Sequence, residues 1–209
     1  MYINYGCGLD APKEWQNYDA SPGIRIQKNP FLYLLLKRYL NVKFPSNVKY
    51  GDIIKGLKGV KENSCDGIYC SHVLEHLSLN DFRIALKNSY AYLKPGGIFR
   101  CIVPDLAYHA KQYIHRLEEK DIAASHKFLQ ITDLGQTTRP KTIKQYLNAY
   151  LTNSRHLWMW DELSLKEELK KTGFQKIRSC QFNDSRDAMY KRVERESRFK
   201  NSVALEAIK

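Results

Sequence analysis

Short apolar segments alternate with helical patterns through the first half of this sequence. Five segments have the character of strands, and each ends at glycine or at a polar residue or turn: Tyr2–Tyr5, Asn17–Tyr18, Asn47–Tyr50, Asp66–Cys70 and Ile98–Val103. Helical patterns lie between them at 31–40 and 80–93, the second with one apolar face made by Phe82, Ala85, Leu86, Ser89 and Leu93. This alternation predicts an α/β fold: a doubly wound, Rossmann-like, mostly parallel sheet with helices on both faces.

The second half of the chain has a different pattern. Residues 106–156 are basic, aromatic and helical, and we expect them to form a helical insertion over the carboxyl edge of the sheet, within a single domain of residues 1–209. A further helix is predicted to begin at Ser164, which forms a capping-box pair with Glu167, and to end at Gly173. Gln175–Phe182 and Val203–Ala207 are predicted to be the final strands, the last one antiparallel.

Cysteine usage and hydropathy bear on the compartment. The five cysteines are Cys7, Cys65, Cys70, Cys101 and Cys180, and none of them forms a C-x-x-C pair. This spacing favours reduced, buried thiols over disulfides or a zinc site. The N-terminus enters a strand directly, which argues against a signal peptide. The longest apolar run, Phe31–Leu36, is too short to span a bilayer. We therefore expect a soluble cytoplasmic protein.

Residues that follow the first three strands have the chemistry of a nucleotide site. Ligands of such folds bind beyond the carboxyl ends of the strands, near the point where strand order reverses. Gly6-Cys7-Gly8 forms a tight turn in which a ligand can approach the backbone. Asp19 ends the second strand, where a carboxylate can accept both hydroxyls of a ribose, and Asp52 after the third could take an adenine amino group. Both aspartates also suit an ordinary turn.

The segment after the fourth strand carries Ser71, His72, Glu75 and His76. Ser71 and His72 lie where a cofactor and an acceptor would meet, and His72 is either a base or an ordinary hydrogen-bonded histidine. Glu75-His76 has the composition of a metal pair, but its neighbours supply no clear third ligand, which favours a solvated helix start. No metal site is therefore predicted, with a carboxylate-rich corner at Asp184 and Asp187 as the one alternative.

The order of these motifs resembles the class I S-adenosylmethionine (SAM)-dependent methyltransferases. The resemblance is to a type 11-like bacterial branch associated with polysaccharide and glycan biosynthesis. It covers most of the chain outside the insertion, in the segments 4–8, 15–22, 66–77, 93–97, 156–161, 173–174, 183–185 and 202–207. Two features depart from the fuller pattern: Leu9-Asp10 stands where a third glycine is usual, and only Leu9–Gln16 connects the first two strands, with no helix. The second departure leaves open how the methionine tail of SAM is held.

The resemblance implies a cofactor, a site and a reaction. SAM would contact Gly6, Cys7, Gly8, Asp19, Asp52, Ser71 and His72. Its methyl group would pass to a small-molecule or glycan acceptor, and a hydroxyl acceptor needs a base. His156 or His72 is the candidate base, with Asp105 and Asp161 as alternatives. His156 equally suits a packing role beside Trp158 and Trp160.

The net charge of +12 leaves other partners open. The insertion is rich in basic and aromatic residues that would suit an anionic glycan or, less well, RNA: Tyr108, Lys111, Tyr113, Arg116, Arg139, Lys141, Lys144 and Tyr146. The 31–40 helix with Lys37-Arg38 would suit peripheral contact with a membrane, although a helix packed on the sheet is the more economical interpretation. A non-catalytic SAM-binding protein and a nicotinamide-dependent oxidoreductase are the alternative classes, and the oligomeric state is open.

Overall fold

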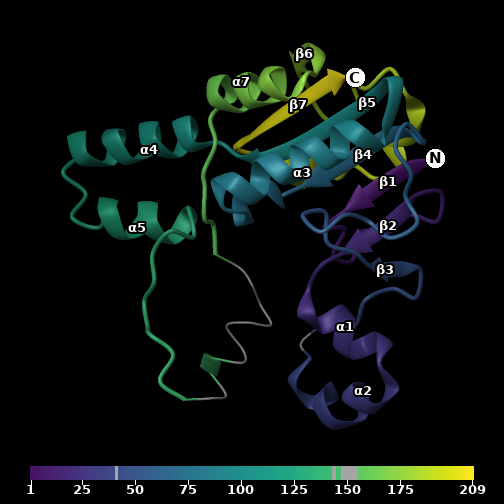
Figure 1. Cartoon of the computed structure of the whole chain (residues 1–209). Helices are drawn as coiled ribbons and strands as arrows, with labels where there is room; N and C mark the ends of the chain where they lie inside the picture. The colour runs from purple at the N-terminus through teal and green to yellow at the C-terminus, as the bar shows by residue number, and fades with distance from the viewer. Residues whose placement is uncertain (41, 143–144, 147–154) are drawn as a thin grey trace.

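A single sheet forms the centre of the molecule (Figure 1). The computed structural model describes residues 1–40, 42–142, 145–146 and 155–209. Its seven strands are ordered β3-β2-β1-β4-β5-β7-β6, with bounds β1 Tyr2–Tyr5, β2 Gln16–Asp19, β3 Val48–Tyr50, β4 Cys65–Ser71, β5 Leu93–Pro104, β6 Gln175–Ser179 and β7 Ser202–Ile208. Strands β1 to β5 pair in parallel, and β7 runs antiparallel to both β5 and β6. The predicted fold class is confirmed.

Two amphipathic helices cover one face of the sheet. Helix α3 (Leu79–Tyr92) buries Phe82, Ala85, Leu86 and Ser89, the face expected from their spacing. Helix α7 (Glu162–Thr172) packs beside it and ends at Gly173, whose φ of 109° is left-handed. The predicted start of α7 at Ser164 is wrong by two residues.

The start of α7 is set by a residue that lies before it. The Asp161 carboxylate accepts a hydrogen bond from the Ser164 backbone N–H at 2.8 Å, and Asp161 N–H donates to the Ser164 hydroxyl. This reciprocal pair is a capping box with Asp161 at the N-cap. Ser164 is therefore the inner member of the box and not its first residue.

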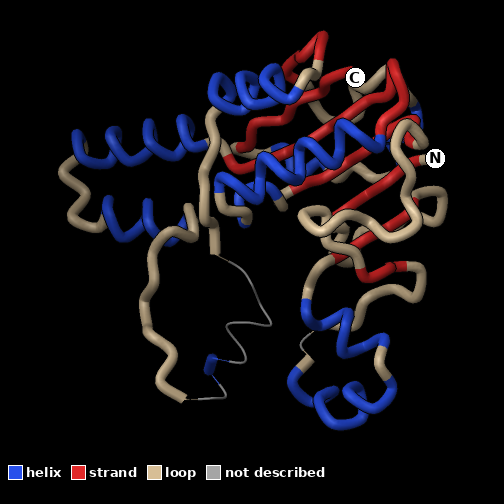
Figure 2. Tube along the Cα trace, viewed as in Figure 1, coloured by secondary structure: helices blue, strands red, loops and turns tan. Residues whose placement is uncertain are grey.

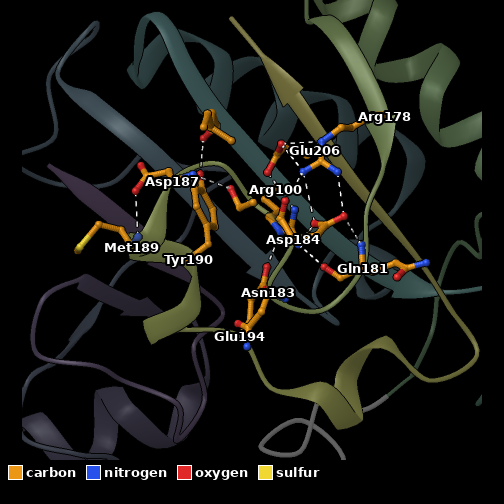
Figure 3. Close-up of polar contacts among 12 residues, drawn as sticks. Arg100, Arg178, Gln181, Asn183, Asp184, Asp187, Met189, Tyr190, Glu194 and Glu206 are labelled. Carbon is orange, nitrogen blue, oxygen red and sulfur yellow. Dashed lines mark hydrogen bonds and ion pairs between the residues drawn. The ribbon is translucent and has the colours of Figure 1, made fainter.

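The other face of the sheet is covered by irregular chain with the short 3₁₀ helices η3 (Ala188–Arg192) and η4 (Glu196–Phe199). The ring of Trp15 packs edge-on against Tyr69 and Tyr190. Figure 3 shows the polar anchor of this cover, Arg100 of β5, which is 0% exposed. It pairs with Glu194, and with Glu206 at 2.9 Å and Asp184 at 2.8 Å.

The same network accounts for the acidic corner at Asp184 and Asp187. Asp184 pairs with Arg100 and with Arg178 at 2.9 Å. Asp187 accepts a hydrogen bond from the Tyr2 hydroxyl at 2.7 Å and caps η3. Because these carboxylates are already engaged by cations and donors of the protein, the corner is structural and not a cation site.

Helix α2 (Pro30–Leu36) overturns the expectation of a helix packed on the sheet. Together with α1 (Pro22–Lys28) and the 3₁₀ turn η1 (Lys37–Tyr39), it projects beyond the edge strand β3 (Figure 2). None of its residues is buried, and Phe31, Leu34 and Leu35 are 71%, 67% and 54% exposed. Burial in the protein core therefore does not explain the apolar residues of α2.

Two helices follow β5. Helix α4 (Leu106–Glu118) and helix α5 (Ala124–Ile131) pack against each other, with the Tyr113 and Phe128 rings 5.4 Å apart, and Figure 1 shows the pair extending past the end of the sheet. Lys144 of the expected basic surface lies outside the described residues. In the part of the chain that the structure describes, no helix is long and apolar enough to cross a membrane.

All five cysteines are buried and unpaired with one another, as expected from their spacing.

Candidate active site

A cleft of about 310 Å³ opens at the carboxyl ends of the parallel strands. It is lined by Tyr5, Gly6, Asp19, Ala20, Ser21, Gly51, Asp52, Ile53, Ile54, His72, Val73, His76 and Leu77. These residues lie at or just after the ends of β1, β2, β3 and β4, and strand order reverses between β1 and β4. This is the place where doubly wound folds bind their ligands.

Gly6 brings two walls of the cleft into close contact. Its φ is +63°, and a Cβ built on it would lie 2.2 Å from Cγ2 of Val73, which follows β4. Any side chain here would collide with Val73 and strain the backbone. Gly8 has a φ of +54° but open space around it.

Asp19 has the turn role expected for it and also lines the cleft. Its side chain is buried, with Oδ2 accepting from Gly8 N–H at 2.9 Å and Oδ1 accepting from Ser21 N–H at 2.8 Å. It is therefore a turn aspartate that braces the glycine loop. A carboxylate has about four acceptor positions, so each oxygen keeps one position for a ligand in the cleft.

Asp52 lies beside two apolar residues that the sequence analysis did not single out. Its Oδ1 accepts from Ile54 N–H at 3.0 Å, and its Oδ2 lies 3.8 Å from Nζ of Lys55. Ile53 and Ile54 line the cleft next to it. A carboxylate beside apolar walls suits a flat heterocycle that carries a hydrogen-bond donor. The position of Ile53 and Ile54 directly after Asp52 is the feature of the sequence that could have indicated their place in the cleft.

Buried asparagines hold the loop that replaces the usual helix between β1 and β2. The Asn4 side-chain amide donates to the Asp10 carbonyl at 2.8 Å and to Oδ1 of Asn17 at 3.2 Å. The Asn17 amide donates to the carbonyls of Pro12 and Trp15. Residues 6–15 contain no helix, as expected, and these bonds supply the order that a helix would otherwise give.

Cys7 and Ser71 lie on the other side of Gly6 from the cleft. They line a smaller cavity of about 20 Å³ together with Asn4, Gly6, Asp10, Tyr69, Val193, Arg195 and Arg198. Burial raises the pKa of Cys7 to about 12, so it is a neutral thiol. The Ser71 hydroxyl is buried and has no hydrogen-bond partner among the described residues.

Asp105 and Asp161 have structural positions. Asp105 caps α4, its carboxylate accepting from Ala107 N–H at 2.8 Å, and Asp161 caps α7. Neither lines the cleft. The structure therefore does not bring the two aspartates to the place where an acceptor would meet the cofactor.

Three histidines converge on Glu75 at one end of the cleft. From Glu75 Oε1, the distances are 3.5 Å to His72 Nδ1, 3.9 Å to His76 Nε2 and 3.9 Å to His156 Nε2. Glu75 is 0% exposed. The expectation of a solvated helix start at Glu75-His76 is therefore wrong, because the segment around His156 covers it.

His156 packs on a histidine and not on the tryptophans near it in sequence. Its ring lies 4.8 Å from that of His76, while Trp160 packs on Phe82 at 4.1 Å. Burial lowers the pKa of His156, and this outweighs the opposite effect of Glu75. His156 is therefore neutral at neutral pH, the form that can accept a proton.

Comparison with known proteins assigns the chain to a family. A family model described as "Methyltransferase domain" matches residues 13–179. The chain belongs to this methyltransferase family. The match includes Asp19, Asp52 and the Ser71–His76 segment, and begins after the glycine loop. It favours the methyltransferase over the nicotinamide-dependent alternative.

Solved structures show that the methyltransferase shares its fold with distant relatives. A SAM-dependent methyltransferase of Archaeoglobus fulgidus has 18% identity and a TM-score of 0.50, over 100% of this chain and 85% of the other. A SAM-dependent methyltransferase of Thermotoga maritima has 14% identity and a TM-score of 0.50, over 100% of this chain and 82% of the other. PigF, solved with SAH, has 16% identity and a TM-score of 0.50, over 100% of this chain and 50% of the PigF chain. No curated protein matches the sequence.

Proposed function

We propose that the methyltransferase binds SAM in the 310 Å³ cleft and transfers its methyl group to a hydroxyl oxygen of a small or glycan acceptor. The observation that carries this proposal is the placement of Gly6, Asp19 and Asp52 around one cleft, at the ends of three neighbouring parallel strands. The family match and the SAH found with PigF support the choice of SAM.

The residues of the cleft suit the parts of SAM in turn. Asp19 keeps acceptor positions for the two ribose hydroxyls, and Gly6, which lines the cleft, lets the cofactor lie against the turn. Asp52 would accept from the adenine amino group, with Ile53 and Ile54 against the ring. The cofactor supplies the activated methyl group, and the protein supplies position and a route for the acceptor proton.

Methyl transfer to a hydroxyl balances as follows. The acceptor oxygen forms a bond to the methyl carbon, the carbon–sulfur bond breaks with its electron pair going to sulfur, and SAH and a proton are released. Alignment of the reacting pair is worth about 7–11 kcal/mol of the barrier. The proton needs an acceptor, and the imidazoles of His72 and His156 beside Glu75 are suited to take it.

The exposed side chains of the insertion support an anionic acceptor. Lys111, Arg139 and Lys141 are exposed, as are the aromatic residues Tyr108 and Tyr146. Cations and rings together suit a phosphorylated or anionic glycan, and RNA is the second candidate. Helix α2 adds an exposed apolar surface next to Lys37 and Lys43, which favours an acceptor presented at an anionic membrane surface.

Two measurements test the proposal. Calorimetry with SAM, SAH and NAD should give binding of the first two alone, and NAD binding without SAM binding would contradict the assignment. Label transfer from methyl-labelled SAM to panels of sugar nucleotides, glycans and RNAs should then identify the acceptor class. Labelling of RNA alone would replace the glycan proposal with the RNA one.

A further inference from the structure

Glu75, His76 and His156 form a compact group of ligand-type side chains beside the cleft. One donor atom from each lies within 4.8 Å of the others. Glu75 is 0% exposed, and neither of its carboxylate oxygens has a hydrogen-bond partner in the described part of the chain. Burial of a carboxylate without a partner is costly, and native structures avoid it. The group therefore calls for a cation that touches the Glu75 oxygens.

The hydrogen bonds of the histidines show which nitrogen of each ring faces Glu75. His76 Nδ1 lies 3.0 Å from the Arg155 carbonyl, and His72 Nε2 lies 2.9 Å from the Arg198 carbonyl. A carbonyl only accepts, so these nitrogens carry the ring protons. The opposite nitrogen of each ring, Nε2 of His76 and Nδ1 of His72, then faces the carboxylate. A backbone carbonyl that holds the outer N–H is the arrangement that orients metal-binding histidines.

The backbone joins the two halves of this group. The Glu75 carbonyl accepts from Leu157 N–H at 2.7 Å and from Trp158 N–H at 3.1 Å. His156 is thereby held next to His76 although the two are far apart in sequence. Donor atoms around a tetrahedral zinc ion stand about 3.4 Å apart. Both histidines are now 3.9 Å from Glu75 and all three donor atoms lie within 4.8 Å, so side-chain rotations can close the group on an ion.

We propose that Glu75, His76 and His156 bind one divalent first-row transition-metal ion, of which Zn²⁺ is the representative. Two imidazoles select such an ion over Mg²⁺ or Ca²⁺, which prefer oxygen ligands. Three protein ligands leave a coordination position open, as in catalytic and not structural zinc sites. His72 Nδ1 and the Asp133 carboxylate, 3.9 Å from His156 Nε2, lie at the margin of the group.

The open position gives the ion a role in the reaction, and this part rests on the proposed function. His76 is both a ligand and a residue that lines the cleft, so the site adjoins the cofactor pocket. An acceptor hydroxyl bound to the ion would lose its proton at a lower pH than in water. His156 would then act as a ligand, and the proton would leave to solvent or to His72.

The test uses the whole chain stripped with a chelator and titrated with Co²⁺ alone, without SAM or acceptor. We expect one Co²⁺ per chain, with the intense visible absorption of a four- or five-coordinate ion, and displacement of Co²⁺ by Zn²⁺. Replacement of a ligand by H76A or H156A should weaken Co²⁺ binding by more than about 100-fold. H115A is the matched control, because His115 is an exposed histidine that also lies beside glutamates.

Further readouts keep the proposal falsifiable. Zn²⁺ should raise the thermal midpoint of the wild type and of H115A but not that of H76A or H156A, and E75Q is the variant of choice if an alanine variant fails to fold. Equal Co²⁺ affinity in wild type and H76A, or an octahedral spectrum in all variants, would overturn the site. SAM binding by the metal-free protein is measured separately, so loss of the metal site and loss of the proposed function give different results.

Discussion

Nε2 of His156 lies 3.9 Å from Oε1 of Glu75 and brings the end of the insertion against the loop after β4. Glu75 is 0% exposed, and His76 lies near its carboxylate and also lines the cleft. The cleft proposed to bind SAM and a cluster of ligand-type side chains thus share one histidine.

Replacement of Asp19 tests the cofactor site. D19N removes the charge and one of the acceptors that brace Gly8 and Ser21. Loss of charged hydrogen bonds to the ribose should weaken SAM binding about 10- to 100-fold, as measured by calorimetry. D121N, which changes an aspartate of the insertion paired with Lys127, is the control and should bind SAM normally. Unchanged affinity in D19N would remove Asp19 from the site.

The two glycines of the loop should respond differently to a methyl group. G6A adds strain at a positive φ and a collision with Val73 and should lower the free energy of unfolding by about 2–5 kcal/mol. G8A adds only the backbone strain, about 1–2 kcal/mol, because nothing lies within 4 Å of its Cβ. Urea unfolding of both variants provides the comparison. Equal losses would show that the contact with Val73 is not tight.

The buried ion network should be essential for stability. R100M leaves Glu194 buried without its cation and Glu206 with Arg178 alone, and should cost about 3–5 kcal/mol in the free energy of unfolding. R178M is the matched control, since Arg178 shares Asp184 and Glu206 but is 38% exposed, and should cost about 1 kcal/mol or less. A small effect of R100M would mean that the carboxylates find other partners.

The same network predicts a dependence of stability on pH. Burial acts to raise the pKa of Asp184, but hydrogen bonds from Arg178, the Gln181 backbone and Arg100 outweigh it and lower this pKa from 3.8 to about 2. Because the folded-state pKa is depressed, the stabilisation is complete above about pH 4 and is lost as the pH falls toward 2. The stability difference between wild type and D184N, measured by denaturant titration, should therefore shrink over this range. A constant difference would contradict the assignment.

Helix α2 should bind anionic vesicles. Phe31 and Leu34 are 71% and 67% exposed, and burial of each in a lipid interface is worth about 1.5–3 kcal/mol. The double variant F31S/L34S should therefore lower co-sedimentation with phosphatidylserine-containing vesicles by more than tenfold in partition coefficient. I122S, which removes a 99% exposed apolar side chain elsewhere, is the control. Absence of wild-type binding would dismiss the membrane surface as the partner of α2.

Local pattern was enough for the sheet and for the place of the cleft. The spacing of Phe82, Ala85 and Leu86 predicted the buried face of α3. The polar residues after the strands predicted the edge of the sheet at which the cleft lies, because the carboxyl ends of parallel strands meet on one side. Local pattern failed for α2, since an apolar helix has the same sequence whether it packs on a sheet or projects from it. It also placed the start of α7 two residues late, since Asp161 and not Ser164 is the cap.

The sequence by itself determined the fold class, the glycine turn at Gly6, the aspartates at strand ends and the reduced cysteines, because each depends on neighbours in the chain. Tertiary structure decided the partners of Arg100 and Glu75. Arg100 finds its carboxylates on segments that follow it by 84 residues or more. Glu75 meets His156, which lies far from it in the sequence. Burial and charge pairing are properties of the folded chain, and no rule of residue spacing predicts contacts between residues so far apart in the sequence.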